Sequence, residues 1–140
     1  MNYMLDTCIV SELVKRQPSP VVVGWLSSIP VRDLFISAVT IGEIKKGISR
    51  LAPDDHRLPP LEAWFAEIQR DYSGRIVAFD ENAAILWGGI AGENSRKGRT
   101  LPVADSQIAA TALVHGMTLV TRNVSDMAGM GVPIFNPFAD

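Results

Sequence analysis

The chain has 140 residues, of which 47% are apolar and 20% charged, and its formal net charge is -2. This length suits one domain with a proper core, and the composition excludes a disordered tail or a surface coated in basic residues for nonspecific nucleic-acid binding. With one cysteine and neither a basic-then-apolar leader nor a long apolar span at the start, we expect a single domain, residues 1–140, of a cytoplasmic protein that has no membrane segment.

The first part of the chain alternates short apolar strands with helices. A strand is predicted over 2–5 and a helix over 7–14, and a second short helix follows over 21–28. The next strand, 33–37, precedes a helix over 40–51 in which Ile41, Ile44 and Ile48 form one stripe. The sequence from Thr40 to Glu43 matches a capping box, so this pattern by itself favours a helix-capping role for Glu43.

The same alternation continues to the end of the chain. A loop over 53–60 leads to a helix over 61–72, a strand over 75–79 and a long helix over 81–96. Pro102 suits the first turn of the following helix, which ends at His115-Gly116 before a short strand over 117–120. A last strand, 131–135, is predicted at a sheet edge because Pro133 has no amide proton to donate. Strands alternating with helices predict an α/β fold, a parallel sheet with helices on both faces.

Four oxygen-bearing side chains follow the predicted strands. Asp6, Glu43, Asp105 and Asn123 each come just after a strand or in the first turn of a helix that follows one. Parallel sheets bind ligands outside the carboxyl ends of their strands, so we expect these four to converge there. Each also has a purely structural explanation, because Asp6 and Glu43 suit helix caps, Asp105 suits a helix N-terminus, and Asn123 suits a turn.

Convergent carboxylates favour a bound cation. Several ionised acids at one place repel one another unless a cation neutralises them, and oxygen ligands favour Mg²⁺ or Mn²⁺. A zinc site is poorly supported, because the chain has only two histidines and one cysteine. A metal-bound water would then serve as nucleophile toward a phosphodiester, with Asp6 or Glu43 orienting or deprotonating it.

Four segments in this order carry a resemblance to a known family. They are Met4-Leu5-Asp6-Thr7, Ser37 to Ile44 (SAVTIGEI), Ala104 to Ala112 (ADSQIAATA) and Leu119 to Asn123 (LVTRN). The ordered set closely resembles PIN-domain ribonucleases, most of all VapC toxins of toxin-antitoxin pairs and their FitB-like branch. The likeness covers almost the whole chain and implies a PIN-like three-layer α/β/α sandwich whose central, mostly parallel sheet has about five strands.

The resemblance also assigns roles by position. It implies that Asp6, Glu43 and Asp105 form the acidic metal site and that Thr7 supports it. Many relatives have an aspartate where this chain has Asn123, and Asp126 is a candidate for the missing fourth acid, with a solvated loop residue as the alternative. It further implies Mg²⁺-dependent (or Mn²⁺-dependent) cleavage of RNA (tRNA, rRNA or mRNA) to 5′-phosphate and 3′-hydroxyl ends. The expected partners are a second copy of the chain and a VapB-like antitoxin, which inserts into the active-site groove and carries the complex to operator DNA.

Local basic clusters are candidate contacts for the RNA backbone. They are Lys45-Lys46 with Arg50, Arg96-Lys97 with Arg99, and Arg122. With Thr7, Arg99 and Arg122 are the individual candidates for substrate binding, and solvated helix faces are the alternative interpretation of all three clusters.

Other functions fit the sequence less well. A catalytically weak or inactive RNA- or protein-binding module of the same fold is kept as an alternative by Asn123. An aspartate-nucleophile phosphatase would need an acid two residues after Asp6, where Cys8 stands, and a phosphate-receiver domain would need paired acids at the first strand. Neither G-x-G-x-x-G nor G-x-x-x-x-G-K-[ST] occurs, which argues against a nucleotide-binding enzyme.

Overall fold

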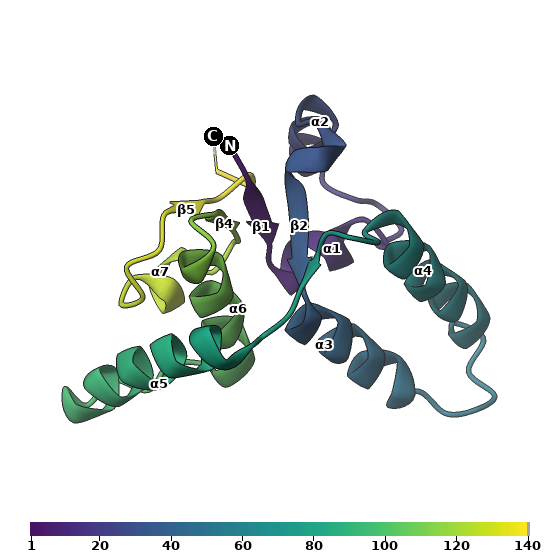
Figure 1. The fold of residues 1–140 in the computed structure, drawn as a ribbon. Coiled ribbons are helices and arrows are strands. Elements are labelled where there is room, and N and C mark those ends of the chain that lie inside the picture. Colours follow the sequence, from purple (N-terminus) through teal and green to yellow (C-terminus); the bar gives the residue numbers. More distant parts are fainter. Residues whose placement is uncertain (140) are drawn as a thin grey trace.

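A parallel sheet forms the centre of the computed structural model, which describes residues 1–139. Its five strands lie in the order β3-β2-β1-β4-β5, and each neighbouring pair is parallel. Their bounds are β1 Tyr3–Leu5, β2 Leu34–Ser37, β3 Ile76–Val77, β4 Thr118–Val120 and β5 Ile134–Phe135. Because β1 lies between β2 and β4, two strands from the first third of the chain and one from near its C-terminal end lie side by side at the centre of the sheet (Figure 1).

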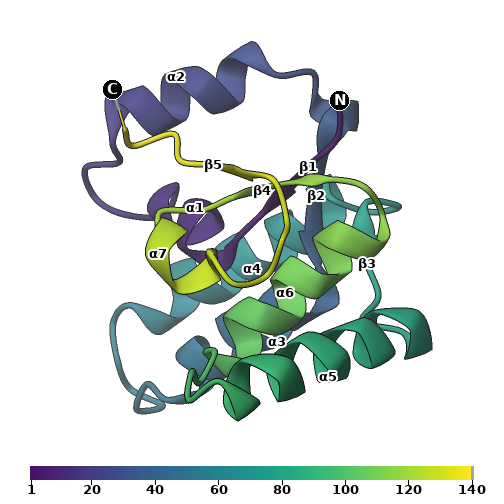
Figure 2. The same cartoon turned by 90° about the vertical axis from the view of Figure 1, so that its left-hand side faces the viewer.

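Helices cover both faces of this sheet. Their bounds are α1 Thr7–Glu12, α2 Pro20–Ser28, α3 Ala38–Ser49, α4 Leu58–Asp71, α5 Glu81–Arg96, α6 Val103–Val114 and α7 Val124–Met127, with a 3₁₀ turn at Val31–Asp33. Helices α5 and α6 lie on one side of the sheet and α3 and α4 on the other (Figures 1 and 2). The three-layer α/β/α architecture predicted from the sequence is therefore confirmed, and the sheet is parallel throughout the described residues.

Because successive side chains of a strand point to opposite faces of the sheet, each face of the sheet has its own apolar core. In β1, Met4 joins a buried cluster with α6, α7 and Leu119, whereas Leu5 joins a second cluster with α1, α3 and Val120. Met4 is in register with Leu119, and Leu5 with Val120, so each face of the sheet carries a continuous apolar row. Both central strands are buried on both sides, which fixes the positions of the residues that follow them.

Several element boundaries differ from the sequence prediction. Helix α3 begins at Ala38, because the Ser37 side chain accepts a hydrogen bond from the backbone N–H of Val39 at 3.0 Å. Pro102 precedes the first helical residue of α6 instead of lying inside its first turn. The strand predicted over 75–79 is confined to two residues, and the short helix α7 was not predicted. The final strand lies at a sheet edge, as the proline at 133 predicted.

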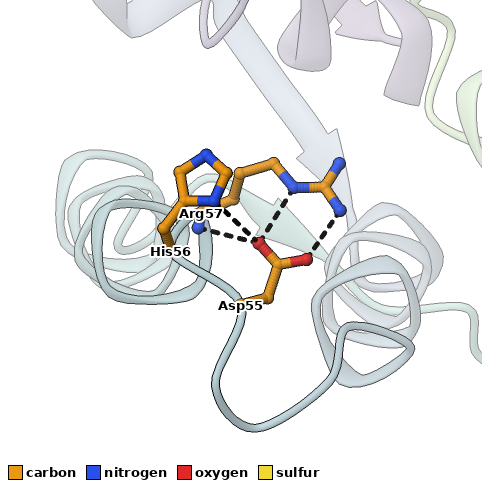
Figure 3. Close-up of polar contacts among 3 residues, drawn as sticks. All are labelled: Asp55, His56 and Arg57. Atoms are coloured by element: carbon orange, nitrogen blue, oxygen red, sulfur yellow. Dashed lines mark hydrogen bonds and ion pairs between the residues drawn. The ribbon is translucent and has the colours of Figure 1, made fainter.

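The loop before α4 is held by one acidic side chain. Asp55 Oδ1 accepts hydrogen bonds from the backbone N–H and Nε of Arg57, and Oδ2 accepts one from Nη2 at 2.7 Å (Figure 3). The Arg57 guanidinium accordingly holds the pKa of Asp55 well below its usual range. With the loop fixed in this way, α4 begins at Leu58 and includes Pro59 and Pro60 in its first turn, three residues earlier than predicted. Within residues 1–139, none of the helices has the length and apolar character needed to cross a membrane.

Candidate active site

The candidate site lies at the carboxyl ends of the three central strands. Asp6 follows β1 directly, Glu43 lies on the helix that begins where β2 ends, and Thr121 follows β4 directly. The strand order β2-β1-β4 places these three segments side by side. The predicted convergence at this edge of the sheet therefore follows from the topology.

Asp6 is the buried centre of the site. It is only 2% exposed, and its Oδ1 accepts a hydrogen bond from the backbone N–H of Thr7 at 2.8 Å, which caps α1. Its Oδ2 accepts a hydrogen bond from the Thr121 hydroxyl at 2.7 Å, and the Cys8 thiol lies 3.7 Å from the same oxygen. Burial raises the pKa of Asp6, the hydrogen bonds from Thr121 and Thr7 oppose that rise, and the charge of Glu43 adds to it. Capping and a role in the site coexist in this residue.

Glu43 faces Asp6 across a threonine. The Thr7 hydroxyl donates to Glu43 Oε1 at 2.6 Å and also lies 3.2 Å from the hydroxyl of Thr40, which is fully buried. The predicted capping box is wrong, because α3 starts two residues before Thr40 and Ser37 is its cap. Glu43 consequently lies in the second turn of the helix, where its carboxylate is free to face the other acids.

The other carboxylates of the site affect the pKa of Asp105. It lies in the first turn of α6 and is partly buried. Burial is the main cause that raises its pKa, and together with the negative charges of Asp6, Glu43 and Asp126 it brings the pKa to about 6. The charges of Asp6, Glu43 and the predicted alternative acid Asp126 therefore all act on Asp105.

Asn123 has a different role in the structure from these acids. It is half-buried at the start of α7, and its side chain forms no cap for that helix. Its backbone N–H donates to the Thr121 hydroxyl at 3.0 Å, so it helps to orient the group that donates to Asp6. Asp126 is exposed on α7, and its negative charge is one of the causes that raise the pKa of Asp105.

The predicted basic contacts lie around this edge in different environments. Arg99 Nη2 donates to the Ser125 carbonyl at 3.0 Å and so ties the end of α5 to α7. The exposed Arg122 guanidinium stacks on the Phe138 ring, 3.5 Å from its centroid. Both side chains are held by the protein near the segment that carries Asn123 and Asp126.

One important residue was missed by reasoning from the sequence. Thr121 is fully buried and links Asp6 to the backbone at Asn123, yet no role was predicted for it. The feature of the sequence that could have identified Thr121 is its position directly after a predicted apolar strand. Thr121 follows Val120 in the same way that Asp6 follows Leu5. Both positions place a polar side chain at the same edge of a parallel sheet.

The donor set suits a hard divalent cation. Among residues 1–139, no three His, Cys, Asp or Glu side chains are arranged so that they surround one ion. Magnesium, however, commonly takes only one or two carboxylates and keeps water in its other positions. Besides burial, the charges of Asp6, Glu43 and Asp126 raise the pKa of Asp105, and a bound cation relieves such repulsion, so the chemistry of these acids fits such an ion.

Two hollows adjoin Glu43. One, of about 470 Å³, lies between α3 and the start of α6 and is lined by Lys46, Arg50 and Ala104 as well as Glu43. The other, of about 220 Å³, is mainly apolar and is lined by Val14, which follows α1, and by residues of α1, α3 and α4 that include Leu61 and Trp64. The acidic site is therefore flanked by a cationic groove on one side and an apolar hollow on the other.

Comparison with known proteins gives consistent matches over nearly the whole chain. A family model described as "PIN domain" matches residues 3–125. The chain is 34% identical to Toxin FitB of Neisseria gonorrhoeae, over 98% of this chain and 99% of that protein. It is 30% identical to VapC ribonuclease Y4jK of Sinorhizobium fredii, over 96% of both chains. A solved structure of FitAB bound to an IR36 DNA fragment superposes with a TM-score of 0.89 at 33% identity, covering 99% of this chain and 96% of the other.

Proposed function

Because the chain belongs to the PIN-domain family, we propose that it is a metal-dependent endoribonuclease of the VapC type, the toxin of a toxin-antitoxin pair. It hydrolyses RNA phosphodiester bonds to leave 5′-phosphate and 3′-hydroxyl ends. The observation that carries this proposal is the placement of Asp6, Glu43 and Asp105 near the carboxyl edge of the sheet, where burial and the charges of Asp6, Glu43 and Asp126 raise the pKa of Asp105. The name of the Sinorhizobium relative, a ribonuclease, supports the same reaction.

Asp6 and Asp105 are the residues that would hold Mg²⁺ or Mn²⁺, with Glu43 and Asp126 nearby. When bound, the ion supplies positive charge at the reacting phosphate and lowers the pKa of a bound water. The chain itself positions its acids for this chemistry. Thr121 fixes Asp6 through Oδ2, and Thr7 holds Glu43 through Oε1, so that the second oxygen of Glu43 can accept a proton from the attacking water.

The partner we propose is a small antitoxin of the VapB or FitA type. The solved relative is a complex of FitAB with DNA, and this chain would likewise reach operator DNA through its antitoxin and form a homodimer. The apolar hollow lined by Val14, Leu61 and Trp64 supports such a partner, since it offers apolar contacts directly beside Glu43. Sedimentation of the purified chain tests the dimer, and a mass of one chain at all concentrations would contradict it.

RNA cleavage by the antitoxin-free chain tests the activity. Structured RNAs, tRNAs among them, are incubated with Mg²⁺ or Mn²⁺ and, in parallel, with EDTA. We expect metal-dependent cleavage that is lost in Asp6→Asn and Asp105→Asn and kept in Asp54→Asn, which removes one exposed carboxylate from the loop before α4. Cleavage retained in both site variants would refute the assigned site.

A catalytically inactive binding module is the competing interpretation. The Asp126→Asn variant tests whether this acid replaces the one absent at Asn123. Unchanged cleavage and unchanged metal affinity would remove Asp126 from the site. Absence of cleavage by the unmodified chain on the whole RNA panel, together with absence of metal binding, would favour the binding module.

A further inference from the structure

The groove between α3 and the start of α6 begins at the acidic site. Glu43 forms part of its wall with Ala104 of α6, and Lys46 of α3 and Arg50, the residue that caps the end of α3, continue the wall. Its volume of about 470 Å³ falls in the range of about 300–1,000 Å³ typical of small-molecule pockets. On that scale, the volume is about that of one or two nucleotides of a single strand.

Along the groove, the charge on one face of α3 changes from negative to positive. Glu43, Lys46 and Arg50 are spaced three and four residues apart, so their side chains lie on the same helix face. With a rise of about 1.5 Å per residue, Lys46 lies about 4.5 Å and Arg50 about 10.5 Å beyond Glu43 along the helix axis. A row of cations therefore begins one turn away from the catalytic acids.

The groove leaves room for a nucleic-acid backbone. Gly42 and Gly47 line it, and a Cβ atom added at either glycine would meet nothing within 4 Å. Because these two positions have no side chain, a ligand can approach the backbone of α3 closely between the charged residues.

Lys46 and Arg50 are available to bind a ligand. Both are exposed, and no carboxylate within residues 1–139 forms an ion pair with either of them. The neighbouring Lys45 lies on a different face of α3, with its ammonium 6.0 Å from the centre of the Phe65 ring, and it lines a separate hollow near Leu58. Of the two adjacent lysines predicted as contacts for the RNA backbone, only Lys46 lines the groove, and Lys45 is therefore not among the contacts proposed here.

We propose that this groove guides single-stranded RNA to the acidic site, with Lys46 and Arg50 binding the phosphates next to the bond that is cut. The inference rests on the proposed function. A polyanion that approaches Asp6, Glu43 and Asp105 is repelled by three carboxylates, in a chain whose net charge is already -2. Two unpaired cations in line with Glu43 offset that repulsion and fix the direction in which the strand crosses the site.

Salt-dependent binding of a short, fluorescent single-stranded oligouridylate in EDTA tests the groove without cleavage. Lys46→Gln and Arg50→Gln are compared with the matched control Lys45→Gln, and glutamine retains the helix propensity of the residue that it replaces. Each groove variant should weaken binding several-fold and reduce the slope of log K against log salt by about 0.7, the loss of one phosphate contact. The control should match the unmodified chain in both quantities.

A second measurement separates the groove from the activity. Cleavage of a tRNA pool with Mg²⁺ should fall in both groove variants and remain unchanged in Lys45→Gln. Normal cleavage and normal salt slopes in Lys46→Gln and Arg50→Gln would overturn the groove while leaving the ribonuclease intact. If the unmodified chain fails to cleave RNA, yet the groove variants lose salt slope, the activity is refuted and the RNA-binding groove stands. No binding of the oligouridylate at all would overturn the groove.

Discussion

Replacing Asp105 by asparagine should stabilise the folded protein in EDTA while it removes activity. The pKa of Asp105 is raised from 3.8 to about 6 by burial and by the charges of Asp6, Glu43 and Asp126. Since one pKa unit corresponds to about 1.4 kcal/mol, ionising this group in the folded chain costs at most about 3 kcal/mol. The side chain is only partly buried, and solvent screening reduces this cost to about 1–2 kcal/mol.

The effect has a defined pH dependence. The folded chain binds the Asp105 proton more tightly than the unfolded chain, so this group lowers the free energy of unfolding as the pH rises from about 4 to about 6. Above about pH 6 the free energy of unfolding is lowered by the full amount, and below about pH 4 it is not lowered by this group. Asparagine cannot ionise, and the Asp105→Asn variant should therefore exceed the unmodified chain in stability at neutral pH and match it near pH 4.

Thermal unfolding in EDTA at both pH values measures this difference. At neutral pH we expect the midpoint of the Asp105→Asn variant to rise by about 3–6 °C, because 1 kcal/mol shifts a chain of this size by about 3 °C. Asp54→Asn, which removes an exposed charge elsewhere, should leave the midpoint unchanged. Added Mg²⁺ or Mn²⁺ should stabilise the unmodified chain more than the Asp105→Asn variant. A variant that is no more stable than the unmodified chain at neutral pH would refute the raised pKa of Asp105.

Three hydroxyl and indole contacts give further predictions. Thr121→Val should lower the free energy of urea unfolding by about 1–3 kcal/mol, because buried Asp6 loses the donor at 2.7 Å; an unchanged value would contradict this role. Thr7→Val should reduce RNA cleavage by about 10–100-fold, because Glu43 loses the group that orients it, and Thr7→Ser should retain most activity. Trp87→Phe should cost about 1 kcal/mol in thermal unfolding, since its indole N–H donates to a serine hydroxyl of α6 at 2.9 Å. An unchanged midpoint in Trp87→Phe would show that this bond adds no net stability.

The fold was largely predictable because its periodic signals are local. The helix predicted over 81–96 matches α5 at both ends, where Asp80 caps the start by accepting a hydrogen bond from the Ala83 N–H at 3.0 Å. The edge position of β5 followed from the missing donor of Pro133. By contrast, α7 has only four residues, too few for a helical period to be recognised.

The site was predictable in position but not in its contacts. A parallel sheet brings the residues that follow its strands to one edge, so Asp6, Glu43 and Asp105 could be expected to lie close together there. The pattern around Thr40 and Glu43 is the same for a capping box and for a second-turn acid, and only the true start of α3 at Ala38 decides between them. The link from Thr121 to Asp6 joins residues that are 115 positions apart, and no local pattern encodes such a contact.

That separation has a consequence for how the protein is made. Strand β1 is synthesised first, yet one of its two neighbours in the sheet, β4, is among the last segments to be synthesised. Contacts between distant parts of a chain form late in folding, since a long loop must close before they are gained. A nascent chain on the ribosome therefore lacks the hydroxyl that holds Asp6 until residue 121 has emerged, and the acids contributed by α6 and α7 also come late. Translation products that end before Thr121 would therefore be unable to assemble the site.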